Sequence, residues 1–116
     1  ETPSNPLLDI VDIRMVSDLA HKVGATVIVD NIMASPILQK PLQLGADVIM
    51  YSATKHMDGQ GRVLAGALLG SFEYIYEKLI PLKETTSCKH LFHLAHHDDS
   101  NFLSLIKNEF IAHKIA

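Results

Sequence analysis

The chain has 116 residues, of which 47% are hydrophobic and 20% charged, and its formal net charge is −3. This length fits one domain, and the apolar fraction is too high for a disordered chain. The slight negative charge offers no basic surface to nucleic acid or to an anionic membrane, and no apolar run approaches the roughly 20 residues of a membrane-spanning helix. A single cysteine and no visible signal peptide favour a cytoplasmic protein without an internal disulfide.

The first 70 residues alternate between helical and strand patterns. Apolar residues recur at helical spacing over 9–23, where Asp12 is a candidate N-cap and Gly24 a candidate stop signal. Three apolar runs predict strands, at 25–30, 46–52 and 65–70, and polar stretches predict loops at 31–40 and 53–64. A further helix is predicted at 72–79. This order is typical of an α/β fold with a mostly parallel sheet flanked by helices.

Polar side chains follow two of the predicted strands. Asp30 ends the first strand, Ser52 ends the second, and Thr54 and Lys55 come directly afterwards. In an open parallel sheet the carboxyl ends of the strands line the ligand crevice. A lysine there can bond to an aldehyde, hydroxyls suit a phosphate, and a carboxylate can hold a protonated ring nitrogen, which are the tasks that pyridoxal phosphate sets a protein. Each residue also has an ordinary role in turns or at the surface, so this pattern leaves the cofactor as one possibility among several.

Three motifs in order add specificity: ETPSNP at 1–6, VDN at 29–31 and YSATKHMDGQGR at 51–62. Together they resemble the γ-family of fold-type I pyridoxal-phosphate enzymes of cysteine and methionine metabolism, which comprises cystathionine synthases and lyases, methionine γ-lyase and homoserine-ester sulfhydrylases. The resemblance runs from Glu1 to about Pro81 and implies the cofactor-binding large domain of that fold. The DGQGRVLAG stretch is most similar to the O-succinylhomoserine sulfhydrylase branch.

The resemblance implies a role for each matched residue. Lys55 would form the Schiff base with the cofactor aldehyde and later move protons, and Asp30 would bind the pyridinium nitrogen. Ser52 and Thr54 would hold the phosphate, while Asn5 would hydrogen-bond the 3′-oxygen of the ring. No metal is implied. Two further expectations concern loops: Glu1 and Arg62 would support their own loops, and the Asn5–Pro6 bond is a candidate for the cis form.

The implied reaction is γ-replacement on an O-acylhomoserine, which gives homocysteine in methionine biosynthesis. The alternatives are cystathionine γ-synthase or γ-lyase activity, and a truncated fragment without catalysis. The family takes a phosphate loop, a ring-stacking aromatic residue and a substrate-binding arginine from outside this stretch, and further phosphate contacts from a neighbouring subunit. We therefore expect a fragment, inactive by itself, of a homotetrameric enzyme with shared active sites and a small amino-acid substrate, with no nucleic-acid or membrane partner.

The composition changes sharply towards the end of the chain. Five of the seven histidines lie between His90 and His113, and no glycine follows Gly70. We expect residues 1–83 to be the central part of the pyridoxal-phosphate-binding domain and 84–116 to be a divergent tail, frameshifted or truncated. On a helix, histidines 90, 93 and 97 would share one face and suit zinc or nickel, with Cys88 nearby. Their spacing matches no named zinc pattern, so a metal-binding module is the least favoured interpretation of the tail. A pair of amphipathic helices is a further interpretation of the same segment.

Overall fold

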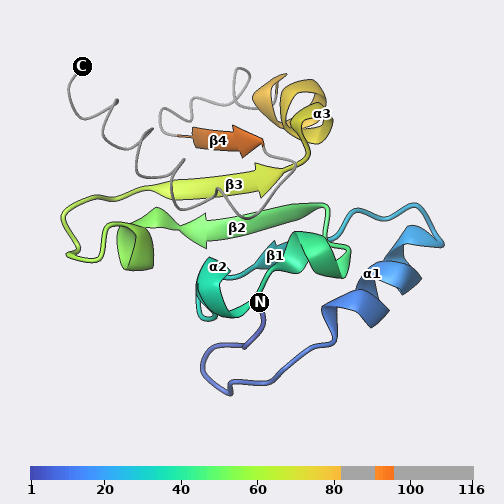
Figure 1. Cartoon of the computed structure of the whole chain (residues 1–116), viewed down its shortest axis with the longest axis horizontal. Helices are drawn as coiled ribbons and strands as arrows, with labels where there is room; N and C mark the ends of the chain where they lie inside the picture. Colours follow the sequence, from blue (N-terminus) through green and yellow to red (C-terminus); the bar gives the residue numbers. More distant parts are fainter. Residues whose placement is uncertain (82–90, 96–116) are drawn as a thin grey trace.

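The structure is a computed structural model that describes residues 1–81 and 91–95 (Figure 1). The elements follow in the order α1 (Ile13–His21), β1 (Ile28–Asp30), α2 (Ser35–Leu38), η1 (Pro41–Leu44), β2 (Val48–Ser52), η2 (Ala53–Met57), β3 (Gly66–Gly70), α3 (Phe72–Tyr74), η3 (Ile75–Leu79) and β4 (Leu91–Ala95). Of these, η1 is a 3₁₀ turn, and η2 and η3 are π-helical turns. Within this part of the chain, no helix has the length and apolarity needed to cross a membrane.

The elements predicted for the first 80 residues are present. All three predicted strands form, each beginning one to three residues later than predicted and ending where predicted. Helix α1 begins after Asp12, whose carboxylate accepts a hydrogen bond of 3.0 Å from the backbone N–H of Met15. Gly24, at φ +71°, lies in the left-handed region that favours glycine after a helix. The caps therefore fix α1 as the sequence indicated.

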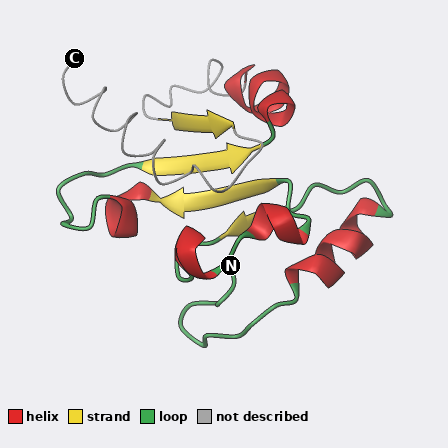
Figure 2. Cartoon of the chain, in the orientation of Figure 1, coloured by secondary structure: helices red, strands yellow, loops and turns green. Residues whose placement is uncertain are grey.

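The four strands form one mixed sheet in the order β1-β2-β3-β4, with helices around it (Figure 2). The β1–β2 and β3–β4 pairs are parallel, whereas β2 and β3 are antiparallel. The expected α/β fold is confirmed, and two of its three strand pairings are parallel. Strand β3 runs antiparallel to β2 because the connecting segment, residues 53–65, reverses the chain at the edge where β2 ends.

Strand β4 lies in the segment for which an amphipathic helix was one interpretation. The backbone of 91–95 is instead extended and pairs in parallel with β3, Leu91 opposite Gly66 and Ala95 opposite Gly70. The helical interpretation is wrong at these residues, which include His93 but neither His90 nor His97. The rest of the histidine-rich tail, including Cys88, lies outside the described residues.

One face of the sheet is buried and the other is partly open. Alternate side chains of the strands form the buried face together with the helical elements: Val29, Ile49, Tyr51, Ala67 and Leu69. On the other face Ile28 is 59% exposed and Met50 is 40% exposed. Alternation along each strand therefore puts Asp30 and Ser52 on the open face, since they share the parity of Ile28 and Met50.

Two glycines allow close approaches that hold the helical elements on the sheet. Gly45 has φ +98°, and a Cβ there would lie 3.0 Å from the Cβ of Ser17 on α1. At Gly70 a Cβ would lie 2.9 Å from the Asp47 carbonyl and 3.5 Å from Cδ1 of the buried Ile75 in η3. A larger residue at Gly45 would push against Ser17 of α1, and one at Gly70 would collide with the Asp47 carbonyl and press on Ile75.

Candidate functional site

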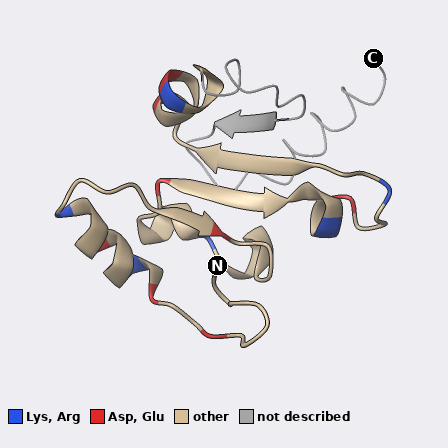
Figure 3. Cartoon of the chain, turned by 180° about the vertical axis from the view of Figure 1, so that it is seen from behind, with Lys and Arg blue, Asp and Glu red and all other residues tan. Residues whose placement is uncertain are grey.

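The carboxyl ends of β1 and β2 lie side by side at one edge of the sheet. Asp30 pairs with Met50, two residues before Ser52, so the carboxylate and the hydroxyl share both the edge and the open face. One oxygen of Asp30, Oδ1, accepts a hydrogen bond of 3.1 Å from the backbone N–H of Ile32. Within residues 1–81 and 91–95, neither Asp30 Oδ2 nor the Ser52 hydroxyl has a hydrogen-bond partner. Both half-buried groups are thus available to a ligand. Figure 3 shows β1, β2 and β3 without charge except at this end of β1.

The turn after β2 presents Lys55 at the same edge. Ala53 is fully buried and anchors this turn. The turn is closed by the backbone N–H of Asp58, which donates to the Ala53 carbonyl at 3.0 Å. Lys55 itself has φ −88° and ψ −106°, outside the helical region, and its carbonyl accepts from Gly59 at 2.8 Å. Its side chain is exposed and forms no ion pair with the residues that the structure describes.

The Thr54 hydroxyl is already committed to the backbone. It donates to the Ala65 carbonyl at 3.3 Å and accepts from the Ala65 N–H at 3.0 Å, while the Thr54 N–H donates to the same carbonyl at 3.2 Å. These bonds tie the turn after β2 to the start of β3. The single hydroxyl proton of Thr54 would have to leave Ala65 before it could be donated to a phosphate.

The polar loop that follows Lys55 is held by its own side chains. The backbone N–H of Arg62 donates to Asp58 Oδ2 at 2.6 Å, and Arg62 Nε lies 4.0 Å from Asp58 Oδ1. The Asp58 side chain is almost completely buried, whereas that of Arg62 is mostly exposed. These contacts agree with the local supporting role expected of Arg62.

The N-terminal motif is folded on itself and attached to the same edge. The Asn5 N–H donates to the Glu1 carboxylate at 3.0 Å, which agrees with the loop-organising role expected of Glu1. The predicted cis bond at Asn5–Pro6 is confirmed, and Thr2–Pro3 is cis as well. The Asn5 side chain is exposed. Because the Thr2 carbonyl accepts from Gln39 Nε2 at 2.8 Å, the motif is tied to the segment that follows β1.

Asn31 is a structural centre that the sequence analysis did not identify. It is 0% exposed, and its Nδ2 lies within hydrogen-bond distance of the Ser35 carbonyl, the Gln39 carbonyl and the Tyr51 hydroxyl, at 3.1, 3.0 and 2.7 Å. Its Oδ1 accepts from Gln39 Nε2 at 2.8 Å. The only sequence signal was its place in the VDN motif, directly after Asp30, since burial of an asparagine at a strand end leaves no mark on periodicity.

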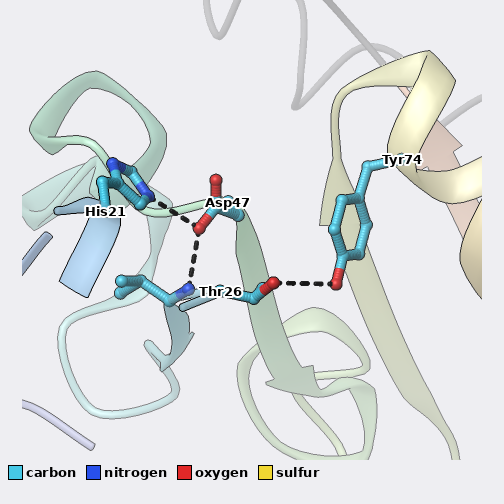
Figure 4. A network of polar contacts seen from close by, with 5 residues as sticks. His21, Thr26, Asp47 and Tyr74 are labelled. Carbon is cyan, nitrogen blue, oxygen red and sulfur yellow. Dashed lines mark hydrogen bonds and ion pairs between the residues drawn. The ribbon is translucent and has the colours of Figure 1, made fainter. Parts of the chain in front are cut away.

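A second polar network lies at the opposite, amino end of the strands (Figure 4). Asp47 Oδ2 accepts from the Val27 N–H at 2.7 Å and contacts His21 Nε2 at 2.9 Å, and the Tyr74 hydroxyl donates to Thr26 at 3.5 Å. Partial burial acts to raise the pKa of the Asp47 carboxyl, but the Val27 hydrogen bond and His21 outweigh it, so the pKa lies below its ordinary value of 3.8. This network joins α1, β2 and α3 and faces away from the candidate site.

The available groups determine which ligands this edge can bind. No group of three His, Cys, Asp or Glu side chains that could hold a metal occurs among the residues described. Lys55, Asp30 and Ser52 supply an amine, a carboxylate and a hydroxyl without competing side-chain partners, which fits the aldehyde, ring nitrogen and phosphate of pyridoxal phosphate. Thr54 fits the phosphate only after its bond to Ala65 is exchanged.

Comparison with known proteins gives the same answer over most of the chain. Residues 1–91 match the family described as "Cys/Met metabolism PLP-dependent enzyme". O-succinylhomoserine sulfhydrylase from Mycobacterium tuberculosis is 60% identical over 75 residues, which cover 65% of this chain and 18% of that protein. Its counterpart from Pseudomonas aeruginosa is 51% identical over 77 residues, or 66% of this chain and 19% of that protein.

The fold is also similar to a solved structure. The crystal structure of an apo methionine gamma lyase from Micromonospora echinospora aligns with a TM-score of 0.69 and 49% identity, covering 72% of this chain and 23% of that chain. This chain thus spans about a fifth of the length of the relatives it matches. The resemblance inferred from the three motifs is confirmed: the chain belongs to the family of enzymes of cysteine and methionine metabolism whose cofactor is pyridoxal 5′-phosphate.

Proposed function

We propose that this chain forms the central part of the cofactor-binding domain of an enzyme that performs γ-replacement on an O-acylhomoserine and produces homocysteine. The observation that carries the proposal is that Asp30 and Ser52 lie at the same edge and on the same face of the sheet. Lys55 is in the turn that directly follows Ser52. The 60% identity to an O-succinylhomoserine sulfhydrylase favours that branch over the lyases. The substrate on this proposal is a small amino-acid ester, and the complete enzyme is cytoplasmic and homotetrameric.

Each residue at the edge has a separate task in this mechanism. When bound, pyridoxal phosphate supplies an electron sink for the carbon atoms α and β to the substrate amine. Asp30 would hold a proton on the ring nitrogen through its free Oδ2, which strengthens that sink. Ser52 would donate its hydroxyl proton to the phosphate, and Asn5 would bind the 3′-oxygen. Together these three groups would hold the ring at the edge of the sheet that Lys55 follows.

Lys55 would act at the reacting atoms. Its amine is the group that would hold the cofactor through the aldehyde. Once free, Lys55 Nζ would remove the α-proton and move protons at Cβ, so that the γ-ester leaves and a sulfur nucleophile adds at Cγ. General base catalysis of this kind contributes about 10²–10⁴-fold to the rate.

The test is a steady-state assay of the complete enzyme. With O-succinylhomoserine and sulfide we expect homocysteine and succinate, and little turnover of cystathionine or methionine. Efficient release of a keto acid from cystathionine or methionine, with no homocysteine from the ester, would assign the chain to a lyase instead. Lys55→Ala should remove turnover in either case.

A chain without catalysis of its own is the second candidate. The partly open face of the sheet favours it, since Ile28 and Met50 are 59% and 40% exposed there. We expect the 116-residue chain alone to give no homocysteine in the same assay. Turnover by the isolated chain at the rate of the complete enzyme would contradict this expectation.

A further inference from the structure

A partly buried chain of amide hydrogen bonds connects the N-terminal motif to the end of β1. Gln39 Nε2 donates to Asn31 Oδ1 at 2.8 Å and to the Thr2 carbonyl at 2.8 Å. Thr2 is 4% exposed and Asn31 is 0% exposed. Both hydrogens of the Gln39 amide are therefore used in bonds to two buried acceptors that come from distant parts of the sequence.

The two ends of this chain lie beside residues of the proposed site. Asn31 directly follows Asp30. The Asn31 N–H donates to the Met50 carbonyl at 3.1 Å, and this bond helps to fix the position of Asp30. At the other end Thr2 is next to Glu1, and the Glu1 carboxylate accepts the Asn5 N–H at 3.0 Å. The Gln39 amide thus bridges the segment that carries Asn5 and the strand end that carries Asp30.

The backbone of Gln39 is held independently of its side chain. The Gln39 carbonyl accepts from Asn31 Nδ2 at 3.0 Å, and the Gln39 N–H donates to the Ser35 carbonyl at 3.2 Å. A substitution that removes only the side-chain amide leaves these bonds in place. Its direct effect is to leave the Thr2 carbonyl and Asn31 Oδ1 without a donor.

We propose that Gln39 is a positioning residue, which fixes the Asn5 segment against the Asp30 strand end without touching cofactor or substrate. The inference rests on the proposed function, because it presumes that Asn5 and Asp30 contact the same ligand. Loss of the bridge frees the Thr2 carbonyl to seek water, and the Asn5 segment moves with it. The geometry of the ligand contacts then changes while the core of the sheet does not.

The first test uses Gln39→Met in the complete enzyme, with Gln43→Met as its control. Gln43 is an exposed glutamine four residues away, so the control makes the same chemical change outside the bridge. In the cofactor-free enzyme we expect exchange of the Thr2, Ser4 and Asn5 amide hydrogens to become about tenfold faster in Gln39→Met only. The dissociation constant for pyridoxal phosphate should also rise about tenfold, with the Gln43 variant within twofold of wild type. Unchanged exchange and unchanged binding in Gln39→Met would overturn the proposal.

A double variant separates positioning from a general structural effect. If Gln39 acts through the Asn5 segment, Gln39→Met with Asn5→Ala should bind pyridoxal phosphate as weakly as Asn5→Ala alone. Effects of the two substitutions that multiply would overturn the proposal. An Asn5→Ala enzyme with wild-type binding would instead contradict the role proposed for Asn5, while the exchange result would still decide the role of Gln39. Should Gln39→Met not fold, Gln39→Glu removes the donors at the same length and takes the same measurements.

Discussion

Asn31 Nδ2 donates to the Tyr51 hydroxyl at 2.7 Å behind the sheet, whereas Asp30 and Ser52, the last residues of β1 and β2, form the candidate site in front. Asn31 follows Asp30 and Tyr51 precedes Ser52, so each member of the buried pair is the neighbour of one half-buried site residue. Because side chains alternate between the two faces, a bond on the back fixes the spacing of the groups on the front. The site is therefore supported from the interior of the domain.

Loss of the Tyr51 hydroxyl should cost less than loss of the Asn31 amide. In Tyr51→Phe, Asn31 Nδ2 keeps two backbone acceptors, so we expect the free energy of unfolding of the complete enzyme to fall by about 1 kcal/mol. Asn31→Leu leaves several buried groups unpaired and should reduce it by about 3 kcal/mol or more. Tyr74→Phe is the control, since it loses only a 3.5 Å bond near the surface. Urea unfolding measures all three, and equal losses for Tyr51→Phe and Asn31→Leu would contradict this account.

Ser52 and Thr54 should respond differently to substitution. Ser52→Ala should weaken pyridoxal phosphate binding about tenfold with little change in thermal stability, because its hydroxyl has no partner among the described residues. Thr54→Val should lower the free energy of unfolding by about 2 kcal/mol, since it breaks both hydroxyl bonds to Ala65. Thr54→Ser, which keeps the hydroxyl, should restore stability. A Thr54→Val enzyme of wild-type stability would show that these backbone bonds are unimportant.

The Asp47 carboxyl should contribute stability that disappears in acid. Its pKa in the folded state lies below the ordinary 3.8, so the unfolded state takes up protons first as the pH falls. The stabilisation is present above about pH 4 and is lost as the pH falls through the folded pKa. Asp47→Asn should therefore be less stable at pH 7, by less than about 1 kcal/mol because the side chain is partly exposed, and the difference should shrink as the pH falls below 3.8 and through the folded pKa.

Denaturant unfolding at a series of pH values measures this difference, with His21→Gln as the companion variant. His21 contributes one of the two contacts to Asp47 Oδ2, so its variant should show part of the same effect. A gap between wild type and Asp47→Asn that is constant from pH 7 to pH 3 would rule out the carboxylate as the source.

Ser17 offers a stabilising substitution. Its side chain is 1% exposed on the buried side of α1, and its Oγ has no hydrogen-bond partner among the described residues. Ser17→Ala removes a buried unpaired hydroxyl and improves helix propensity, so thermal unfolding should show a gain of about 1 kcal/mol. Asp18→Ala, at the next and exposed position, reports the effect of an added alanine and a removed charge without the loss of a buried hydroxyl. A loss of stability in Ser17→Ala would indicate that Oγ has a partner in the complete enzyme.

Much of the fold could be predicted because the controlling interactions are local. The carboxylate cap of Asp12 and the β-branched run before Asp30 act within a few residues, and both elements formed as predicted. The antiparallel direction of β3 and the strand at 91–95 depend on pairing between distant segments, which periodicity does not report. The order Asp30, Ser52, Lys55 at one edge followed from topology, whereas the bridge through Gln39 required the folded chain.

The most direct test of the central proposal is to identify the lysine that bonds to the cofactor. The complete enzyme is incubated with pyridoxal phosphate, reduced with borohydride and digested, and the modified peptide is identified by mass spectrometry. We expect the pyridoxyl group on the peptide that contains Lys55, and its loss in Lys55→Ala, with the exposed Lys22, Lys40 and Lys78 unmodified. A pyridoxyl group on another lysine, unchanged in Lys55→Ala together with full turnover, would contradict the account.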